Sequence, residues 1–422
     1  MTSKHCRLPA KLRGRGRYVA LIVACTASTA LIAACGGGDE GADASGGTVT
    51  FGANTQLSGT LQIYGLPAVQ GVESAAEFIN ENGGIEVDGE TYEAVVAAED
   101  NRSDPSAIVS ASRAVVDSGA IAALGPDLGA NPSYEVFQQN EVITFTPAFD
   151  LQLELLSDPE SHPLLFSPTV FLAELFVTNM KQLKSQFAEI ETVAILAPND
   201  EQGQGSAGAY QDAAEQEGLE VVANESFPPN ATDFTSVLTQ FRQQQPDLLI
   251  ALQSAEQATA ILQQAAQLDV APYGLNDVLT PDQVFDVQGL GDMTLIIPNF
   301  SPTFSPSATI PDYDPEPVFR GEEPAGSPGA AINMFYAFIL LAQAIEEAGT
   351  ISDTTAIAEA LPGQSYDGPF GTCTMSERRE LDCETIVYVV EGEEITVHQF
   401  PDPDSVEPMA TYLCRQGECE AQ

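Results

Sequence analysis

Short apolar segments alternate with helical patterns along this chain, and no other feature limits its fold as strongly. Ala120–Pro126 and Thr192–Pro198 are unbroken apolar runs, typical of strands buried on both faces of a parallel sheet. Between such runs, apolar residues recur at helical spacing, for example at Val69, Val72 and Ala76. Strands joined through helices form right-handed βαβ crossovers. The sequence therefore predicts an α/β fold with doubly wound sheets.

The alternation pauses after Pro163 and begins again with the strand at 192–198, so we expect two doubly wound lobes of similar size. A length of 422 residues agrees with two domains of about 100–200 residues each. The strongly apolar helix at 332–348 is interrupted by two amide side chains, and we interpret it as a core helix rather than a membrane span. The pattern at 366–400 predicts two β-hairpins, the first closed by a disulfide.

The N-terminus has the organisation of an export signal. Residues 4–17 are basic, residues 18–34 are apolar and small, and a Gly-rich polar run follows Cys35. The segment Ile32–Cys35 resembles the lipobox of bacterial lipoproteins, which implies cleavage before Cys35 and a lipid on its thiol. An ordinary signal peptide with an incidental cysteine is the alternative.

Net charge limits the classes of partner. The chain carries 61 acidic and 15 basic side chains, a formal net charge of −46. Six of the basic residues lie before residue 18, which leaves a net charge of −52 on the remainder. Phosphate groups are bound by clustered Lys and Arg, so this composition excludes a nucleic-acid or anionic-membrane surface binder. It also favours neutral or cationic ligands over anionic ones.

Cysteine usage agrees with export. Four cysteines remain beyond the predicted lipid site: Cys373, Cys383, Cys414 and Cys419. An even number in an exported chain indicates two disulfides, and local order favours Cys373–Cys383 and Cys414–Cys419 among three possible pairings. A zinc site is the alternative, but the spacings C-x9-C and C-x4-C without a His in the cluster do not suit one, so we expect no metal.

A series of short motifs resembles the type 1 periplasmic binding proteins, specifically the leucine/isoleucine/valine-binding group. The motifs are Leu57–Gly59 with Tyr64–Gly65, Ala75–Asn80 with Gly83–Ile85, Glu99–Asp100 with Ser103–Pro105, Ala123–Pro126, Asn199–Asp200 with Gly203–Gly205, and Pro228 with Thr232–Phe234. The likeness covers most of residues 48–400. It implies two Rossmann-like lobes joined by a hinge of crossover strands, and a small solute captured between them. It also implies delivery to an ABC permease powered by ATPase subunits.

The patterns and the resemblance together predict how the chain is divided. The expected parts are a lipoprotein signal peptide at 1–34, a flexible tether at 35–47, a first lobe from 48–165 and 298–350, a second lobe from 166–297 and 351–400, and a disulfide-bearing tail at 401–422. The protein is expected outside the cytoplasm, in the periplasm or anchored by lipid to the outer face of the cell membrane.

Loops that follow strands supply the candidate ligand-binding side chains, because ligands of open parallel sheets bind at the carboxyl ends of the strands. The candidates are Tyr64, Asp127, Leu128, Ala148, Phe149 and Asp150 on the first lobe, and Gln202, Gln253, Ser254 and Asp277 on the second. Phe149 and Tyr64 are expected to pack on an apolar or planar ligand.

The chain departs from the pattern of its amino-acid-binding relatives, in which small hydroxyl residues hold the ligand carboxylate. Here Asp127 follows Gly-Pro, Asp150 lies near the next such position, and Gln202 replaces an aromatic residue. Carboxylates at an anion-binding loop repel a ligand carboxylate, which favours a neutral or cationic solute such as an amide or urea over a plain amino acid. Asp277 is the hypothetical partner of a ligand cation, with a solvated loop acid as the alternative. A helix N-cap or turn role remains open for Asp127, and a core role for Phe149.

Cofactor and enzyme interpretations fit less well. Gly203, Gly205 and Gly208 match the dinucleotide fingerprint, but four residues separate the strand from the first glycine, where a nucleotide loop turns at once. Beyond the signal only His162 and His398 remain, and no G-x-S-x-G, HExxH or P-loop is present. We therefore expect no cofactor and no enzyme. The alternatives to an import receptor are a ligand-sensing module coupled to a signalling partner and, less favoured, a hydrolase.

Overall fold

The computed structural model describes most of the chain after residue 43. The described residues are 44–59, 61–126, 130–146, 155–156, 158–169, 172–252, 255–277, 279, 290–299, 310–311, 313–321, 328–415 and 418–422. All the described residues belong to one compact unit. The predicted signal peptide and Cys35 lie outside the described residues.

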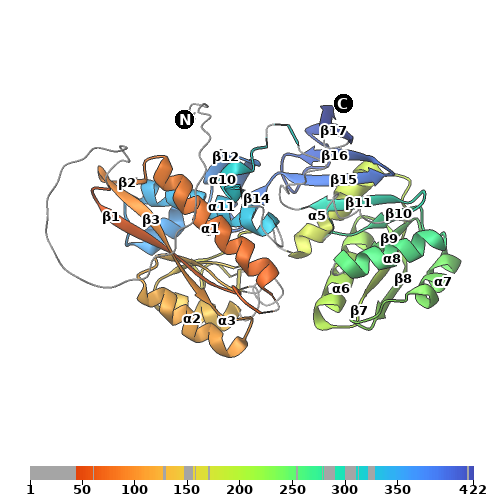
Figure 1. The fold of residues 1–422 in the computed structure, drawn as a ribbon, viewed down its shortest axis with the longest axis horizontal. Helices are drawn as coiled ribbons and strands as arrows, with labels where there is room; N and C mark the ends of the chain where they lie inside the picture. The colour runs from red at the N-terminus through yellow and green to blue at the C-terminus, as the bar shows by residue number, and fades with distance from the viewer. Residues whose placement is uncertain are drawn as a thin grey trace, which may run out of the picture. The chain divides into compact units, whose positions relative to one another are not determined.

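The first sheet has six strands in the order β2-β3-β1-β4-β5-β6 (Figure 1). Their bounds are β1 Gly47–Thr55, β2 Ile85–Val87, β3 Glu90–Asp100, β4 Ala122–Leu124, β5 Ile143–Phe145 and β6 Leu165–Phe166. All neighbours pair in parallel except β2 and β3. The predicted parallel sheet is confirmed.

Helices cover both faces of this sheet because successive strand residues point to opposite sides. Leu124 of β4 packs in one cluster with α1 (Gln62–Glu81) and α11 (Pro328–Ala348). Its neighbour Ala123 packs in another with Val115 of α2 (Pro105–Asp117) and Phe137 of α3 (Ala130–Gln139). Because both faces of the sheet are buried, its short strands are apolar throughout rather than alternating with polar residues. The side chain of Asp104 accepts a hydrogen bond from the Ser106 amide at 2.9 Å and so caps the start of α2.

The second sheet has nine strands in the order β18-β17-β16-β15-β11-β10-β9-β7-β8. The parallel strands are β7 Thr192–Pro198, β8 Glu220–Phe227, β9 Leu248–Ala251, β10 Tyr273–Leu275 and β11 Thr294–Asn299. The antiparallel strands are β15 Thr385–Glu391, β16 Glu394–Phe400, β17 Ala410–Arg415 and β18 Glu418–Ala421. The helices are α5 Leu172–Gln186, α6 Glu201–Gln216, α7 Thr235–Gln244 and α8 Ala255–Gln267. Helix α6 begins at Glu201, because Asp200 caps it through the Gly203 amide at 2.7 Å.

Helix α11 is the centre of the first core. Its Phe338 ring lies 5.1 Å from Phe51 and 5.3 Å from Phe145, centroid to centroid. Among the described residues it is the one helix long and apolar enough to cross a membrane, and 83% of its apolar window is buried within the protein. The predicted core helix is confirmed. Two short helices accompany it, α10 Glu316–Phe319 and α12 Thr354–Ala360.

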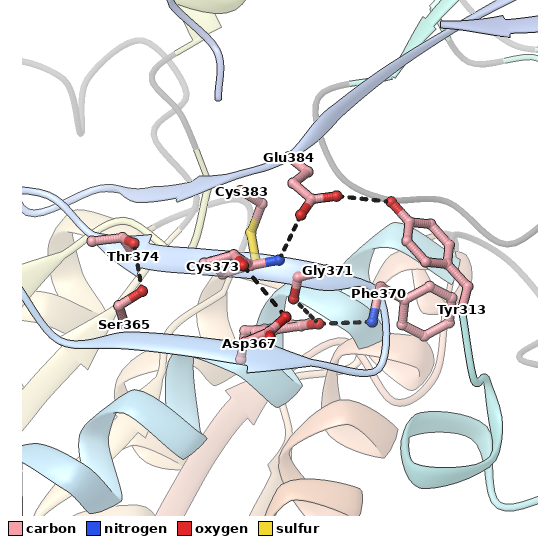
Figure 2. Close-up of a disulfide and its surroundings, with 11 residues drawn as sticks. Tyr313, Ser365, Asp367, Phe370, Gly371, Cys373, Thr374, Cys383 and Glu384 are labelled. Carbon is pink, nitrogen blue, oxygen red and sulfur yellow. Dashed lines mark hydrogen bonds between the residues drawn. A yellow bond between two sulfur atoms is a disulfide. The ribbon is translucent and has the colours of Figure 1, made fainter. Parts of the chain in front are cut away.

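A small third sheet contains β12 Ser365–Gly368, β13 Gly371–Met375 and β14 Leu381–Cys383. The predicted two hairpins are thus a three-stranded meander followed by the β15–β16 hairpin. Cys373 and Cys383 face each other across β13 and β14 and form a disulfide (Figure 2), and Cys414 and Cys419 form another between β17 and β18. The predicted disulfide pairing is confirmed.

Along the chain, a single residue, Glu384, separates the last strand of the small sheet, β14, from the strand β15 of the large one. The buried carboxylate of Glu384 accepts a hydrogen bond from the Tyr313 hydroxyl at 3.3 Å (Figure 2). It also accepts hydrogen bonds from the Thr372 amide (3.0 Å) and the Gln399 side-chain amide (2.6 Å). Elements before Glu384, from α12 to β14, contribute Ile357, Phe370 and Cys383 to the first core. The predicted second lobe begins again at 351, whereas in the structure pairing with the second sheet begins at Thr385. The remaining domain boundaries stay a prediction.

Candidate functional site

The carboxyl edge of the first sheet is organised by Asp100, which ends β3 opposite Thr55 of β1. Its carboxylate accepts hydrogen bonds from the amides of Leu57 (3.0 Å), Ser58 (3.2 Å) and Arg102 (2.7 Å), and from the Ser58 hydroxyl (2.6 Å). Partial burial raises the pKa of Asp100, but these hydrogen bonds outweigh it and hold the pKa below its ordinary value. Asp100 therefore fixes the loop that leads from β1 into α1.

A buried polar network supports the same edge. The Asn54 side-chain amide donates to the Ile108 carbonyl (3.0 Å) and the Ser112 hydroxyl (2.8 Å), and its oxygen accepts from Asn101 (3.2 Å). The Ser112 hydroxyl lies 2.9 Å from that of Ser133. The network joins β1, α2 and α3, and sequence reasoning missed it. Polar residues at the end of an apolar strand and within a buried helical stripe were the available signal.

The first turns of α1 present an apolar surface to solvent. Ile63, Tyr64 and Leu66 are 49%, 38% and 44% exposed, which is unusual for large apolar side chains in the described part of the chain. Between them, Gly65 packs against the backbone of Gln56 so closely that a Cβ atom would lie 2.2 Å from its carbonyl oxygen. This contact holds the turn against the end of β1. Exposed apolar groups at a strand edge are typical of ligand or partner contact, and Tyr64 was among the predicted residues.

The carboxyl edge of the second sheet contains Asp277, two residues after β10. The Tyr210 hydroxyl of α6 donates to its Oδ2 atom at 2.7 Å, and the Asn179 side chain of α5 donates to the Tyr210 oxygen at 3.1 Å. The preceding Asn276 is fully buried and donates to the Ala251 carbonyl at 2.6 Å, which ties this edge to β9. Burial raises the pKa of Asp277, and the Tyr210 hydrogen bond only partly opposes this shift.

Asp277 has no cationic partner within the described residues. The arginines and lysine in ion pairs there contact other acids: Arg242 with Asp269, Arg320 with Glu77 and Glu81, Arg378 with Glu174 and Glu380, Arg415 with Glu394, and Lys181 with Asp404. A partly buried carboxylate without a protein cation is suited to accept from a ligand nitrogen.

The remaining predicted site residues are not tested. Asp127, Leu128, Ala148, Phe149, Asp150, Gln253 and Ser254 lie outside the described residues, as does the lipid site Cys35. Gln202 is the second residue of α6. The structure therefore describes the surroundings of Tyr64 and Asp277, each at the carboxyl edge of its own sheet.

The glycines of the fingerprint-like string lie inside α6 rather than in a loop before it. A Cβ atom on Gly203 would lie 2.4 Å from the Pro198 carbonyl oxygen, so this glycine serves close packing of the helix on the end of β7. A nucleotide loop needs its glycines before the helix, where their amides face the phosphates. Within the described part of the chain, no three His, Cys, Asp or Glu side chains are grouped to hold a metal ion.

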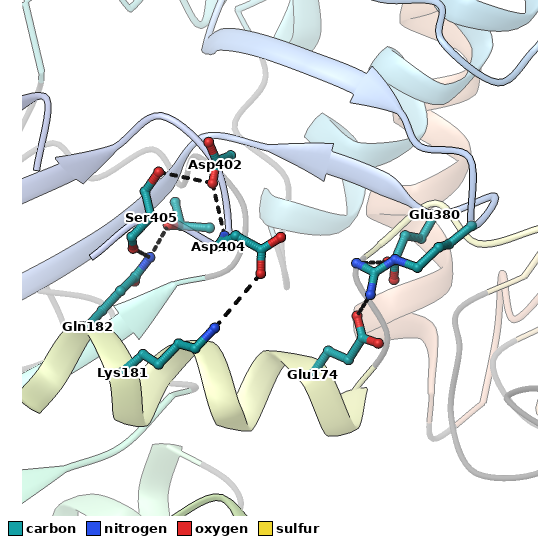
Figure 3. Close-up of polar contacts among 9 residues, drawn as sticks. Glu174, Lys181, Gln182, Glu380, Asp402, Asp404 and Ser405 are labelled. Atoms are coloured by element: carbon teal, nitrogen blue, oxygen red, sulfur yellow. Dashed lines mark hydrogen bonds and ion pairs between the residues drawn. The ribbon is translucent and has the colours of Figure 1, made fainter. Parts of the chain in front are cut away.

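The chain segments that link the two large sheets are tied together by polar contacts. After β6, the Ser167 amide donates to the Arg379 carbonyl (2.8 Å) and the Ser167 carbonyl accepts from the Leu381 amide (3.0 Å). In α5, Lys181 pairs with Asp404 at 3.9 Å, and the Gln182 side chain donates to the Ser405 carbonyl at 3.3 Å (Figure 3). These contacts tie the chain after β6 to β14 and the turn before it, and they tie α5 to the loop between β16 and β17.

Similar proteins of known sequence and structure are binding proteins. A Leu/Ile/Val-binding protein homologue from Brucella melitensis is 24% identical over 79% of this chain and 88% of its own length. A branched-chain amino acid transporter substrate-binding protein from Streptococcus pneumoniae, solved with isoleucine, has a TM-score of 0.60 and 20% identity, covering 89% of this chain and all of that one. An ABC transporter solute-binding protein from R. palustris, solved with benzoate, has a TM-score of 0.62 and 13% identity, covering 86% and 97%.

The family model described as "Periplasmic binding protein" matches residues 48–393, most of the chain. That match spans the first sheet, the small sheet, the second sheet from β7 to β15, and the edges that carry Tyr64 and Asp277. This chain therefore belongs to the periplasmic binding protein family.

Proposed function

We propose that this protein is the solute receptor of an ABC importer and that its solute carries a cationic or N–H donor nitrogen. The surroundings of Asp277 are the observation that supports a solute with such a nitrogen. It is a partly buried carboxylate at the end of a parallel strand, without a cationic partner among the described residues. Burying a carboxylate without a counter-charge is unfavourable, and a bound ammonium or amide group would offset that cost.

The apolar turn of α1 supports a second property of the solute. Ile63, Tyr64 and Leu66 expose large apolar side chains at the carboxyl edge of the first sheet. A solute with an apolar part would cover them during binding and remove that area from water. An amine or amide with a short apolar chain fits both edges.

Capture by closure of two lobes, delivery to a permease with its ATPase subunits, and anchoring through a lipid on Cys35 complete the proposal. The ABC transporter relatives and the lipobox-like Ile32–Cys35 support these steps. The protein would then lie outside the cytoplasm, held at the outer face of a membrane.

Calorimetric titration of the purified protein with matched pairs of solutes tests the proposal. L-Leucine, L-leucinamide and isoamylamine carry a nitrogen, whereas 4-methylpentanoate and benzoate lack one; urea carries nitrogen without an apolar chain. We expect binding within the first group, weaker binding of urea, and no binding of the nitrogen-free acids. Equal binding of leucine and 4-methylpentanoate would contradict the role of Asp277. Consumption of a bound solute, followed by mass spectrometry, would instead indicate a hydrolase.

A further inference from the structure

We infer that Tyr210 is a positioning residue for ligand recognition, because its hydroxyl holds one oxygen of Asp277 and directs the other toward the nitrogen of the solute. This inference rests on the proposed function of Asp277. It assigns a role in binding to a side chain that lies entirely within the protein and has no access to a ligand.

The ring of Tyr210 is fixed in place by its surroundings. Tyr210 is 0% exposed and packs among Met180, Ile195 and Leu275 in the apolar cluster beneath the sheet. Its ring lies 4.1 Å from that of Phe176, centroid to centroid, with the planes tilted by 36°. A side chain held in this way delivers its hydroxyl to one position, so the geometry of Asp277 is set by the core rather than by a solvent-exposed loop.

The hydrogen bonds have one possible direction. An ionised carboxylate only accepts, so the Tyr210 hydroxyl must donate its single hydrogen to Asp277 at 2.7 Å. The hydroxyl oxygen can then only accept from Asn179 at 3.1 Å, which assigns the facing atom of Asn179 as the amide nitrogen. The chain Asn179 to Tyr210 to Asp277 therefore runs from α5 through α6 to the end of β10, and each donor strengthens the next.

This chain also controls the protonation of Asp277. Burial raises the pKa of the carboxyl, and the hydrogen bond from Tyr210 lowers it. Tyr210 of α6 contacts the carboxylate directly, the neutral amide of Asn179 on α5 contacts Tyr210, and no charged side chain of the described residues shifts this pKa. Removing the Tyr210 hydroxyl thus raises the pKa further, and Asp277 becomes neutral at a higher pH.

The test compares Tyr210→Phe with the wild-type protein by titration of L-leucinamide between pH 4.5 and 8. We expect the affinity of Tyr210→Phe to fall about tenfold at neutral pH, as for a hydrogen bond to a charged group. The acid limb of its affinity profile should move to higher pH, which a purely structural role of Tyr210 would not produce.

Tyr273→Phe is the matched control. Tyr273 lies at the other end of β10, and its hydroxyl also donates to a carboxylate, that of Glu189 at 2.7 Å. This variant should keep the wild-type affinity and pH profile. Asn179→Leu keeps the Tyr210 hydroxyl and should shift the acid limb in the same direction as Tyr210→Phe, but by less. If circular dichroism shows that Tyr210→Phe does not fold, Asn179→Leu takes its place in the test.

The outcomes separate the two proposals. A wild-type protein that binds neither L-leucinamide nor L-leucine overturns the proposed function, and the inference with it. If the wild-type protein instead binds while Tyr210→Phe and Asn179→Leu keep the wild-type affinity and pH profile, that result overturns the inference alone.

Discussion

Asp100 and Asp277 occupy similar places in the two large sheets but have opposite surroundings. Each lies where a parallel strand ends. Asp100 accepts four hydrogen bonds from its own loop, whereas Asp277 accepts one from the side chain of a buried tyrosine and one from its own backbone amide. The pKa of Asp100 lies below the ordinary value, and that of Asp277 above it. A carboxylate whose acceptor capacity is filled by its own loop stabilises the scaffold. One that is buried with less compensation is available for a ligand.

The largest expected effect follows from Asp277→Asn. The substitution preserves shape but removes the charge, so the affinity for L-leucinamide should fall about 100-fold. Calorimetric titration measures it. Asp212→Asn, which alters an exposed acid on α6, should bind like the wild type. Equal losses in both variants would mean that overall charge, rather than a contact at Asp277, governs affinity.

Asp100→Asn should instead reduce stability, by about 1–2 kcal/mol after allowing for solvent screening, because three amides and a hydroxyl lose a charged acceptor. A lowered carboxyl pKa stabilises the folded state above the ordinary value and loses that contribution as the pH falls through the folded value. Thermal melting from pH 3 to 7 should therefore show the variant below the wild type at neutral pH, with the difference shrinking below about pH 4. A constant difference across this range would argue against the assigned role.

Ile63→Ser combined with Leu66→Ser tests the apolar turn. The affinity for L-leucinamide should fall about threefold while the melting temperature stays near that of the wild type, since both side chains are already exposed. Val406→Ser with Met409→Ser provides the control, because these side chains are 43% and 50% exposed in the loop before β17. Loss of affinity in the control pair would point to a general effect of surface hydrophobicity.

The smallest expected effect is that of Asp277→Asn on stability, and it should be a gain where Asp100→Asn causes a loss. Because the pKa of Asp277 is raised in the folded protein, its ionised form opposes folding above that pKa. Asp277→Asn should therefore raise the melting temperature of the ligand-free protein by about 1–2 °C at pH 7. The gain should vanish in acid, where Asp277 is protonated. A lower melting temperature would show that the carboxylate stabilises the scaffold.

Local signals predicted the local structure well. Unbroken apolar runs marked β4 and β7, and cysteine order predicted both disulfides. The packing of α12 and the small sheet against α11 was missed because it depends on contacts between segments rather than on any pattern within one.

The candidate site was predictable only where it follows a strand. Asp277 was found by its place after β10. Tyr210 was not, because an aromatic residue within a helix has the sequence pattern of an ordinary core side chain, and its hydroxyl partner lies 67 residues away in the chain. Asn54 and Ser112 were missed because the two side chains that meet lie 58 residues apart in the chain.

The single-residue link at Glu384 has a mechanical consequence. Its buried carboxylate accepts hydrogen bonds from three places: from Thr372 beside the disulfide of the small sheet, from Gln399 in the large sheet, and from Tyr313. Any rotation of the backbone at this link has to stretch at least one of these bonds where water cannot replace it. Rotation at this link is therefore coupled to these hydrogen bonds, and it costs free energy whenever one of them is lost.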